Sequence, residues 1–348
     1  MSGSLIIPPF RPLRLFAGGH RQTLAGAFLP GKLAPEKGKI HQVDLADGEA
    51  VVIHDDQPPE WIAGGPTAVL VHGLAGCHRS GYLVRIAAKL NARGVRTLRM
   101  NLRGSGTGAA LAMKPYHGGC SDDVVAVVRF VERLCPGSPI TLLGFSLGGN
   151  IVLKLLGEAP DRVPSAVIRA AAVNPPIDLE QSVVALQRWS LRPYDRYFVK
   201  LLLRRLSERQ FLHPNVPTAT FPQPPRRIFD FDNHYTAPAS GYRDALDYYE
   251  QCSSQQFLTH IRVPTLILTS CDDPLIAVSM FERQVAAKNL SPQIQLHIAA
   301  GGGHLGYLAR GSNDPDERWL DWRMVDWVLA SSNASSTCEK VISHRHLL

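Results

Sequence analysis

Short apolar segments alternate with amphipathic segments along most of the chain. Uninterrupted apolar runs bounded by Gly, Pro or polar residues predict buried strands at 67–72, 95–100, 139–144, 166–173, 264–270 and 294–298. Apolar residues that recur every three or four positions predict helices at 81–93, 122–134, 148–156, 280–288 and 316–330. Strands that alternate with helices predict a mostly parallel central sheet with helices on both faces.

Two regions depart from this alternation. Residues 39–54 predict an antiparallel hairpin, because two short strand-like segments flank Asp47-Gly48, a pair that favours a tight turn. Residues 174–255 show helical patterns without a convincing strand. We therefore expect four parts: an N-terminal arm (1–38), an α/β core (39–173 and 256–330), an inserted helical cap (174–255) and a flexible tail (331–348).

The composition is that of a globular protein with enough apolar residues for a core. Of the 348 residues, 45% are hydrophobic and 19% are charged. The net charge of +7 is accompanied by no nucleic-acid-binding motif, so we expect no nucleic-acid partner. The six cysteines form no C-x-x-C pair and show no zinc-ligand spacing. We expect reduced cysteines, no metal and no cofactor.

The N-terminal residues do not resemble a secretion signal. The apolar segment Leu5–Phe10 contains Pro8 and Pro9 and is followed at once by Arg11. No segment approaches the roughly 18 apolar residues that a transmembrane helix needs. These features predict a cytoplasmic location.

The segment Gly144-Phe145-Ser146-Leu147-Gly148 matches the G-x-S-x-G pattern. The pattern alone is weak, but an apolar strand runs directly into it and a predicted helix follows. A sharp strand-to-helix turn exposes the serine hydroxyl, and the helix N-terminus supplies donors for a developing oxyanion. Ser146 is therefore the candidate nucleophile, and the alternative is a coincidental loop serine.

A serine hydroxyl needs a general base, and in this arrangement the histidine comes last along the chain. His304 follows Gly301-Gly302-Gly303, directly after the last predicted strand, where a loop could bring its imidazole over the site. His297 lies inside that strand, and His344 and His346 lie in the predicted tail. His304 is therefore the candidate base, and the alternative is a surface-loop histidine.

The acid that orients the imidazole is expected after the strand at 264–270. Asp272 and Asp273 both stand there, ahead of Pro274. We favour Asp273 and keep Asp272 as the alternative; a purely structural Asp-Asp-Pro turn is the third possibility.

The oxyanion hole requires two backbone donors. Leu147, directly after the nucleophile, supplies one, and the loop after the strand at 67–72 supplies the other, most simply through Leu74. His72, at the start of that loop, is interpreted as a structural residue. The Gly-rich segment 101–106 lacks the P-loop lysine pattern, so we interpret it as a wall of the site.

The predicted cap contains a basic amphipathic helix. Arg196, Lys200 and Arg204 recur every four residues, and the expected opposite side carries Tyr197, Phe198, Leu201, Leu202 and Leu206. The simpler interpretation is a solvated face above a packed helix. The alternative is a weak peripheral contact with an anionic lipid surface, or guidance of an acyl chain.

Two further motifs, together with the candidate triad, resemble the AB hydrolase 4 family of YheT-like and ABHD1/2/3-like α/β-hydrolases. One is His20-Arg21-Gln22-Thr23-Leu24. The other extends over residues 229–254 and comprises Phe229-Asp230-Phe231-Asp232, Thr236-Ala237-Pro238, Gly241-Tyr242, Asp247-Tyr248-Tyr249 and Ser253-Ser254. The resemblance covers roughly residues 8 to 330.

The resemblance implies the α/β-hydrolase fold and a carboxylic-ester hydrolase, esterase or lipase in character, with a triad of Ser146, Asp273 and His304. Eukaryotic relatives carry an N-terminal membrane anchor, and its absence here fits a soluble, bacterial-type member. We expect a small-molecule ester or lipid substrate, because the predicted cap is apolar. Two alternatives remain: acyl transfer to an alcohol or thiol through the same triad, and a non-catalytic ligand-binding homologue.

Overall fold

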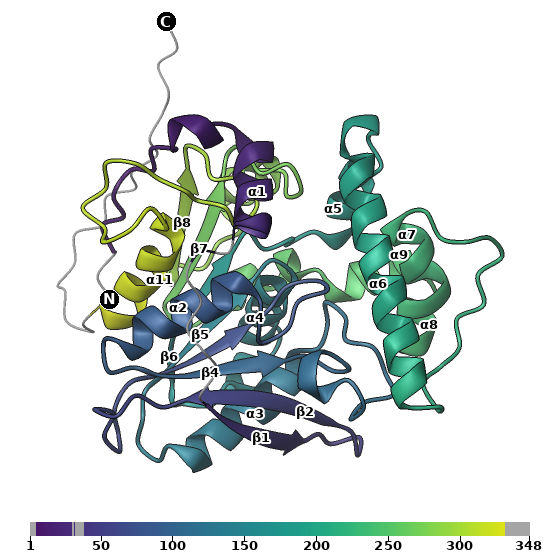
Figure 1. The fold of residues 1–348 in the computed structure, drawn as a ribbon, viewed down its shortest axis with the longest axis horizontal. Helices are drawn as coiled ribbons and strands as arrows, with labels where there is room; N and C mark the ends of the chain where they lie inside the picture. Colours follow the sequence, from purple (N-terminus) through teal and green to yellow (C-terminus); the bar gives the residue numbers. More distant parts are fainter. Residues whose placement is uncertain (1–4, 30, 32–37, 331–348) are drawn as a thin grey trace, which may run out of the picture.

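The computed structural model describes residues 5–29, 31 and 38–330. Its centre is an eight-stranded sheet in the order β1-β2-β4-β3-β5-β6-β7-β8 (Figure 1). The strands are β1 (Lys39–Asp44), β2 (Ala50–Asp56), β3 (Thr67–Val71), β4 (Arg96–Asn101), β5 (Ile140–Phe145), β6 (Val167–Val173), β7 (Thr265–Ser270) and β8 (Ile294–Ala299). β2 is antiparallel to its neighbours β1 and β4, and all other neighbours are parallel. The predicted mostly parallel sheet with an N-terminal hairpin is confirmed.

Alternate residues of the buried strands point to opposite faces of the sheet. Leu70 and Leu143 pack in one cluster with helices α2 (Gly81–Asn91) and α11 (Trp319–Leu329). The neighbouring residues Val71 and Leu142 pack in a second cluster with α3 (Ser121–Leu134), α4 (Leu147–Glu158) and α10 (Ser279–Ala286). Central strands buried on both faces read as continuous apolar runs, which explains their pattern in the sequence. The helices therefore cover both faces of the sheet.

Between β6 and β7 the chain forms helices and no strand. They are α5 (Leu179–Leu186), α6 (Arg192–Leu212), α7 (Ile228–Phe231), α8 (Ala237–Ala239) and α9 (Ala245–Cys252), with the short helices η4 (Trp189–Leu191), η5 (Asp232–Thr236) and η6 (Ser254–His260). In Figure 1, α6 stands beside the core with α7, α8 and α9 next to it. We call residues 174–255 the cap segment.

The N-terminal region contains a helix that the pattern analysis did not predict. After η1 (Arg14–Phe16), residues Gly19–Phe28 form α1. Phe10 is buried against Tyr307 and Trp319, so the first described residues pack on the core. The remaining short helices are η2 (Gly106–Gly108) and η3 (Pro160–Arg162). The predicted tail, with His344 and His346, lies outside the described residues.

Among the residues that the structure describes, none of the helices combines the length and the apolar character that crossing a bilayer requires.

Candidate active site

Ser146 lies in a strained turn between β5 and α4. Its backbone has φ 52° and ψ −123°, a conformation that non-glycine residues rarely adopt. A Cβ on Gly144 would lie 2.4 Å from the Gly148 carbonyl oxygen, and one on Gly148 would lie 2.5 Å from the His72 carbonyl oxygen. The glycines of G-x-S-x-G are therefore required by steric crowding around the turn, and the strain presents the serine hydroxyl at the sheet edge.

Hydrogen bonds connect the three predicted triad residues in series. The Ser146 Oγ lies 2.9 Å from the His304 Nε2, and the His304 Nδ1 lies 2.9 Å from the Asp273 Oδ2. The carboxylate only accepts, so Nδ1 carries the proton and Nε2 is free to accept from the serine. The side chains of His304 and Asp273 are 9% and 0% exposed, which keeps this relay largely away from water.

The two neighbouring aspartates have different partners. The Asp273 Oδ1 accepts hydrogen bonds from the backbone N–H groups of Leu275 and Ile276, and its Oδ2 accepts from the Asn174 Nδ2 at 2.7 Å. Asp272 instead accepts from the Gly303 N–H at 2.9 Å, in the loop that carries the histidine. Asp273 therefore faces the imidazole, whereas Asp272 braces the loop.

Asn174 was not predicted as a site residue. It follows β6 directly with φ 45°, and its Oδ1 accepts from the Tyr307 hydroxyl at 3.1 Å. It thereby holds the Asp273 carboxylate against the core. A polar residue at the carboxyl end of a buried strand was the available signal, since ligand and catalytic groups gather at that edge of parallel sheets.

Helix α1 holds the loop that carries His304. The His304 backbone N–H donates to the Thr23 Oγ1 at 2.8 Å, and the Thr23 hydroxyl donates to the Gly19 carbonyl at 2.7 Å. The buried Gln22 amide pairs with the backbone of Leu308 through two bonds of 2.7 and 3.0 Å. In the sequence, the His-Arg-Gln-Thr-Leu motif stands out only through the family resemblance, and spacing does not predict its contact with the histidine loop.

In residues 73–76, directly after β3, one backbone N–H group has no acceptor within the described part of the chain. The N–H groups of Gly73, Ala75 and Gly76 donate to the Tyr82 hydroxyl, the Tyr116 hydroxyl and the Gly73 carbonyl, respectively. Among the described residues, the N–H groups of Leu74 and Leu147 have no acceptor, and both residues line the cavity beside Ser146. This arrangement leaves two donors for an oxyanion.

His72 holds this loop from behind. Its Nδ1 donates to the Gly73 carbonyl at 2.8 Å, and its Nε2 accepts from the Leu102 N–H at 3.1 Å. Burial lowers the pKa of His72 to about 4, so the imidazole is neutral at physiological pH. These contacts agree with the interpretation of His72 as a structural residue.

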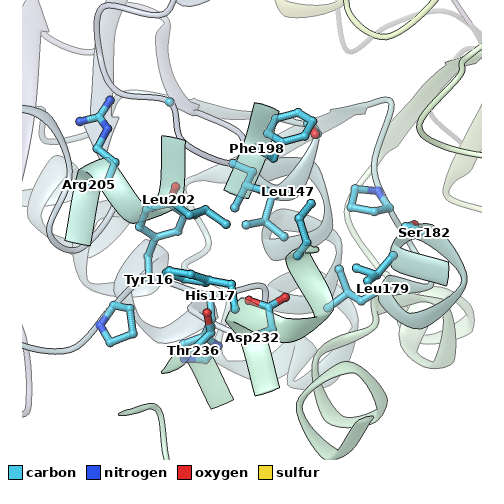
Figure 2. A pocket seen from close by; sticks show the side chains of 18 of the residues that line it. Tyr116, His117, Leu147, Leu179, Ser182, Phe198, Leu202, Arg205, Asp232 and Thr236 are labelled. Atoms are coloured by element: carbon cyan, nitrogen blue, oxygen red, sulfur yellow. The ribbon is translucent and has the colours of Figure 1, made fainter. Parts of the chain in front are cut away.

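A cavity of about 120 Å³ opens beside Ser146 and His304, between the core and the cap segment (Figure 2). Most of its wall is apolar, made by Leu74, Leu147, Leu179, Val183, Phe198, Leu202, Leu206, Ile228, Phe231, Leu275 and Ile276. Arg103, Gly104 and Ser105 also line it, as expected for the Gly-rich segment. The cavity offers an apolar environment to a chain attached to the reacting group.

One part of the cavity wall is polar. Figure 2 shows His117, Asp232 and Thr236 gathered on the side opposite Phe198. The Tyr249 hydroxyl donates to the Asp232 carboxylate at 2.8 Å. Burial raises the pKa of Asp232 to about 6 and lowers the pKa of His117 to about 3. Neither residue was predicted as a site residue, although Asp232 lies in the second family motif.

The basic helix in the sequence corresponds to α6. Phe198, Leu202 and Leu206 line the cavity as part of its apolar side. Tyr197 was wrongly assigned to that side, because it is 46% exposed and does not line the cavity. Its position one residue after the outward-facing Arg196 rotates it toward solvent.

The chain belongs to the α/β-hydrolase fold family, whose sequence model matches residues 66–310. It is 31% identical over 335 residues to the protein named "Putative esterase YheT" of Escherichia coli (strain K12), covering 94% of this chain and 95% of that protein. The resemblance to YheT-like and ABHD-like hydrolases is therefore confirmed.

Other curated relatives are more distant. Phospholipase ABHD3 of Mus musculus is 26% identical over 293 residues, which cover 82% of this chain and 70% of that protein. Among solved structures, the Pyrococcus furiosus esterase Pf2001 superimposes with a TM-score of 0.54 at 14% identity and covers 94% of this chain and 98% of that chain. At this identity the structural similarity establishes the fold alone.

Proposed function

We propose that this chain hydrolyses carboxylic esters through a covalent acyl-enzyme, with Ser146 as nucleophile, His304 as general base and Asp273 as the orienting acid. The observation that carries the proposal is the unbroken series of hydrogen bonds from the Ser146 hydroxyl through the imidazole to the buried Asp273 carboxylate. The esterases and lipases among the relatives support the same reaction class.

The reaction has two steps. His304 accepts the Ser146 proton as the serine oxygen bonds to the ester carbonyl carbon, and the N–H groups of Leu74 and Leu147 stabilise the oxyanion. The intermediate collapses, and the leaving alkoxide takes the proton from His304 and departs as the alcohol. Water, deprotonated by His304, then attacks the acyl carbon. This attack frees the carboxylic acid and returns the proton to Ser146.

We further propose that the substrate is lipid-like, with an acyl chain in the apolar part of the cavity. The support is the composition of the wall, where Leu and Phe side chains from α5 and α6 lie beside the serine and histidine. Each buried methylene contributes about 0.8 kcal/mol. Longer chains should therefore lower KM or raise kcat/KM until the cavity is filled.

A panel of p-nitrophenyl esters of increasing chain length tests both parts of the proposal. Wild type should hydrolyse the panel with a chain-length optimum, and Ser146→Ala should lose at least about a thousandfold in kcat. Ser182→Ala is the matched control, because Ser182 also lines the cavity and its hydroxyl contacts the Asp178 carbonyl and the Met280 sulfur, neither of which belongs to the candidate triad.

Equal turnover by wild type and Ser146→Ala would overturn the assignment of the nucleophile. Adding alcohol acceptors to the assay separates hydrolysis from acyl transfer, because hydrolysis yields the free acid as the main product. Labelling of Ser146 by a fluorophosphonate probe tests the reactive serine independently of the substrate chosen.

A further inference from the structure

Helix α6 has two functional faces. Phe198, Leu202 and Leu206 point into the cavity beside the candidate triad. On the opposite face, Arg196 and Lys200 are exposed to solvent, in line with the outward-facing Arg204. The same helix therefore lines the cavity with one face and presents a basic surface with the other.

The charge of this surface is strongly one-sided. Residues 188–212 contain seven Lys or Arg residues, of which Arg209 is buried and Arg205 lines the cavity. The five that remain on the outer face stand against two acids, Asp195 and Glu208. Asp195 is buried and accepts from the Ile228 N–H, so it does not neutralise the outer face. Glu208 pairs with Arg204 at 2.8 Å. No ion pair joins Arg192, Arg196 or Lys200 to another residue in the described ranges.

Large apolar side chains flank the basic residues at both ends of the helix. Trp189, in η4 just before α6, is 82% exposed, and Phe211, in the last turn, is 88% exposed. Tyr197 is 46% exposed between them. These large side chains expose apolar surface to water at both ends of a stripe of positive charge. A partner that is both anionic and apolar would fit this surface.

We propose that the outer face of η4 and α6, formed by Arg188, Trp189, Arg192, Arg196, Tyr197, Lys200, Arg204 and Phe211, docks on an anionic phospholipid surface. Lys and Arg are attracted to anionic headgroups, and Trp and Phe bury their rings at the boundary with the acyl chains. Docking through this face places the cavity directly behind the helix that contacts the lipid. This surface delivers a lipid-like ester to the proposed active site, and in that role it rests on the proposed function.

Vesicle binding tests the proposal directly. The full chain is mixed with vesicles of phosphatidylcholine alone and with vesicles in which part of this lipid is replaced by phosphatidylglycerol. We expect binding to the anionic vesicles only, weakened by added salt because screening shortens the range of the attraction. Trp189 emission should shift to shorter wavelength on binding, and Trp189→Phe should remove most of that shift.

The triple variant Arg196→Gln, Lys200→Gln, Arg204→Gln should bind anionic vesicles roughly a hundredfold more weakly, at about fivefold per charge removed. The matched control replaces three exposed basic residues of β1 and α3, Lys39, Arg129 and Arg133, by Gln, and should bind like wild type because none of them belongs to the proposed surface.

Activity measurements keep this proposal separate from the proposed function. The α6 triple variant should keep wild-type turnover of a soluble ester and lose turnover of an ester embedded in anionic vesicles. Absence of vesicle binding by wild type, equal binding to both vesicle types, or equal binding by the two triple variants would overturn the docking surface. Failure of the ester hydrolysis itself would overturn the proposed function and leave the binding result standing.

Discussion

Thr23 gives the sharpest test of how the candidate active site is assembled. Its hydroxyl accepts the His304 backbone N–H at 2.8 Å and donates to the Gly19 carbonyl at 2.7 Å. Thr23→Val keeps the shape of the side chain and removes both bonds. The His304 N–H is then left without its acceptor in a site where Thr23 is 8% exposed.

An unsatisfied buried donor costs about 1–3 kcal/mol, and 1.4 kcal/mol corresponds to a factor of ten. The loop can regain this free energy only by moving, which displaces the imidazole from the Ser146 hydroxyl. We therefore expect kcat to fall about tenfold to a hundredfold with little change in KM, since the cavity wall is untouched. Thr23→Ser keeps the hydroxyl and should restore most of the activity.

The assay measures kcat and KM across pH for an ester that wild type hydrolyses well, with thermal unfolding measured in parallel. Thr265→Val is the control, because it removes a buried hydroxyl that donates to the Val263 carbonyl at 2.7 Å at the far end of β7. A loss of stability in both variants with a loss of kcat in Thr23→Val alone supports a positioning role. Wild-type kcat and an unchanged pH profile in Thr23→Val would refute the reasoning.

Three other substitutions test separate parts of the structure. Asp273→Asn should lower kcat by about ten-thousandfold with folding retained, because the amide can favour the wrong imidazole tautomer at His304; steady-state kinetics and circular dichroism check this. Gly148→Ala should destabilise the fold by several kcal/mol, because its Cβ would lie 2.5 Å from backbone carbonyl oxygens, and an unchanged melting temperature would contradict the crowded turn. Burial raises the pKa of Asp232 from 3.8 to about 6, so the folded state binds the carboxyl proton more tightly than the unfolded chain does. The free energy of unfolding therefore falls as pH rises from 4 to 6. Asp232→Asn should therefore gain stability over wild type by up to about 3 kcal/mol at pH 7 and by little at pH 4, measured by urea unfolding.

The order of strands and helices could be predicted from the sequence because it depends on local regularities. Apolar runs between turn residues marked each strand from β3 to β8, and Asp47-Gly48 marked the β1–β2 hairpin, where Gly48 has φ 83°. The G-x-S-x-G segment is also local, since its glycines relieve contacts within a few residues of the strand-to-helix turn or with the adjacent strand. Chain order then restricted the base and the acid to the ends of the last two strands.

The tertiary structure decided which groups meet. Asp272 and Asp273 are adjacent in sequence and identical in chemistry, and only the packing of the His304 loop distinguishes the carboxylate that contacts the imidazole from the one that contacts the loop backbone. Thr23 contacts a residue 281 positions away, and Asn174 contacts one 99 positions away. No periodicity in a sequence encodes such distances, because they follow from how the sheet brings separate strand ends together.

The amphipathic pattern of α6 likewise fixed which residues share a face but not what each face meets. The sequence placed Arg196, Lys200 and Arg204 together, because residues four apart lie side by side on a helix. Folding put Phe198 against the cavity and left Tyr197 in solvent, since the rotation of the helix is set by the core packed beneath it. Local patterns thus determined the elements, and long-range packing determined the site.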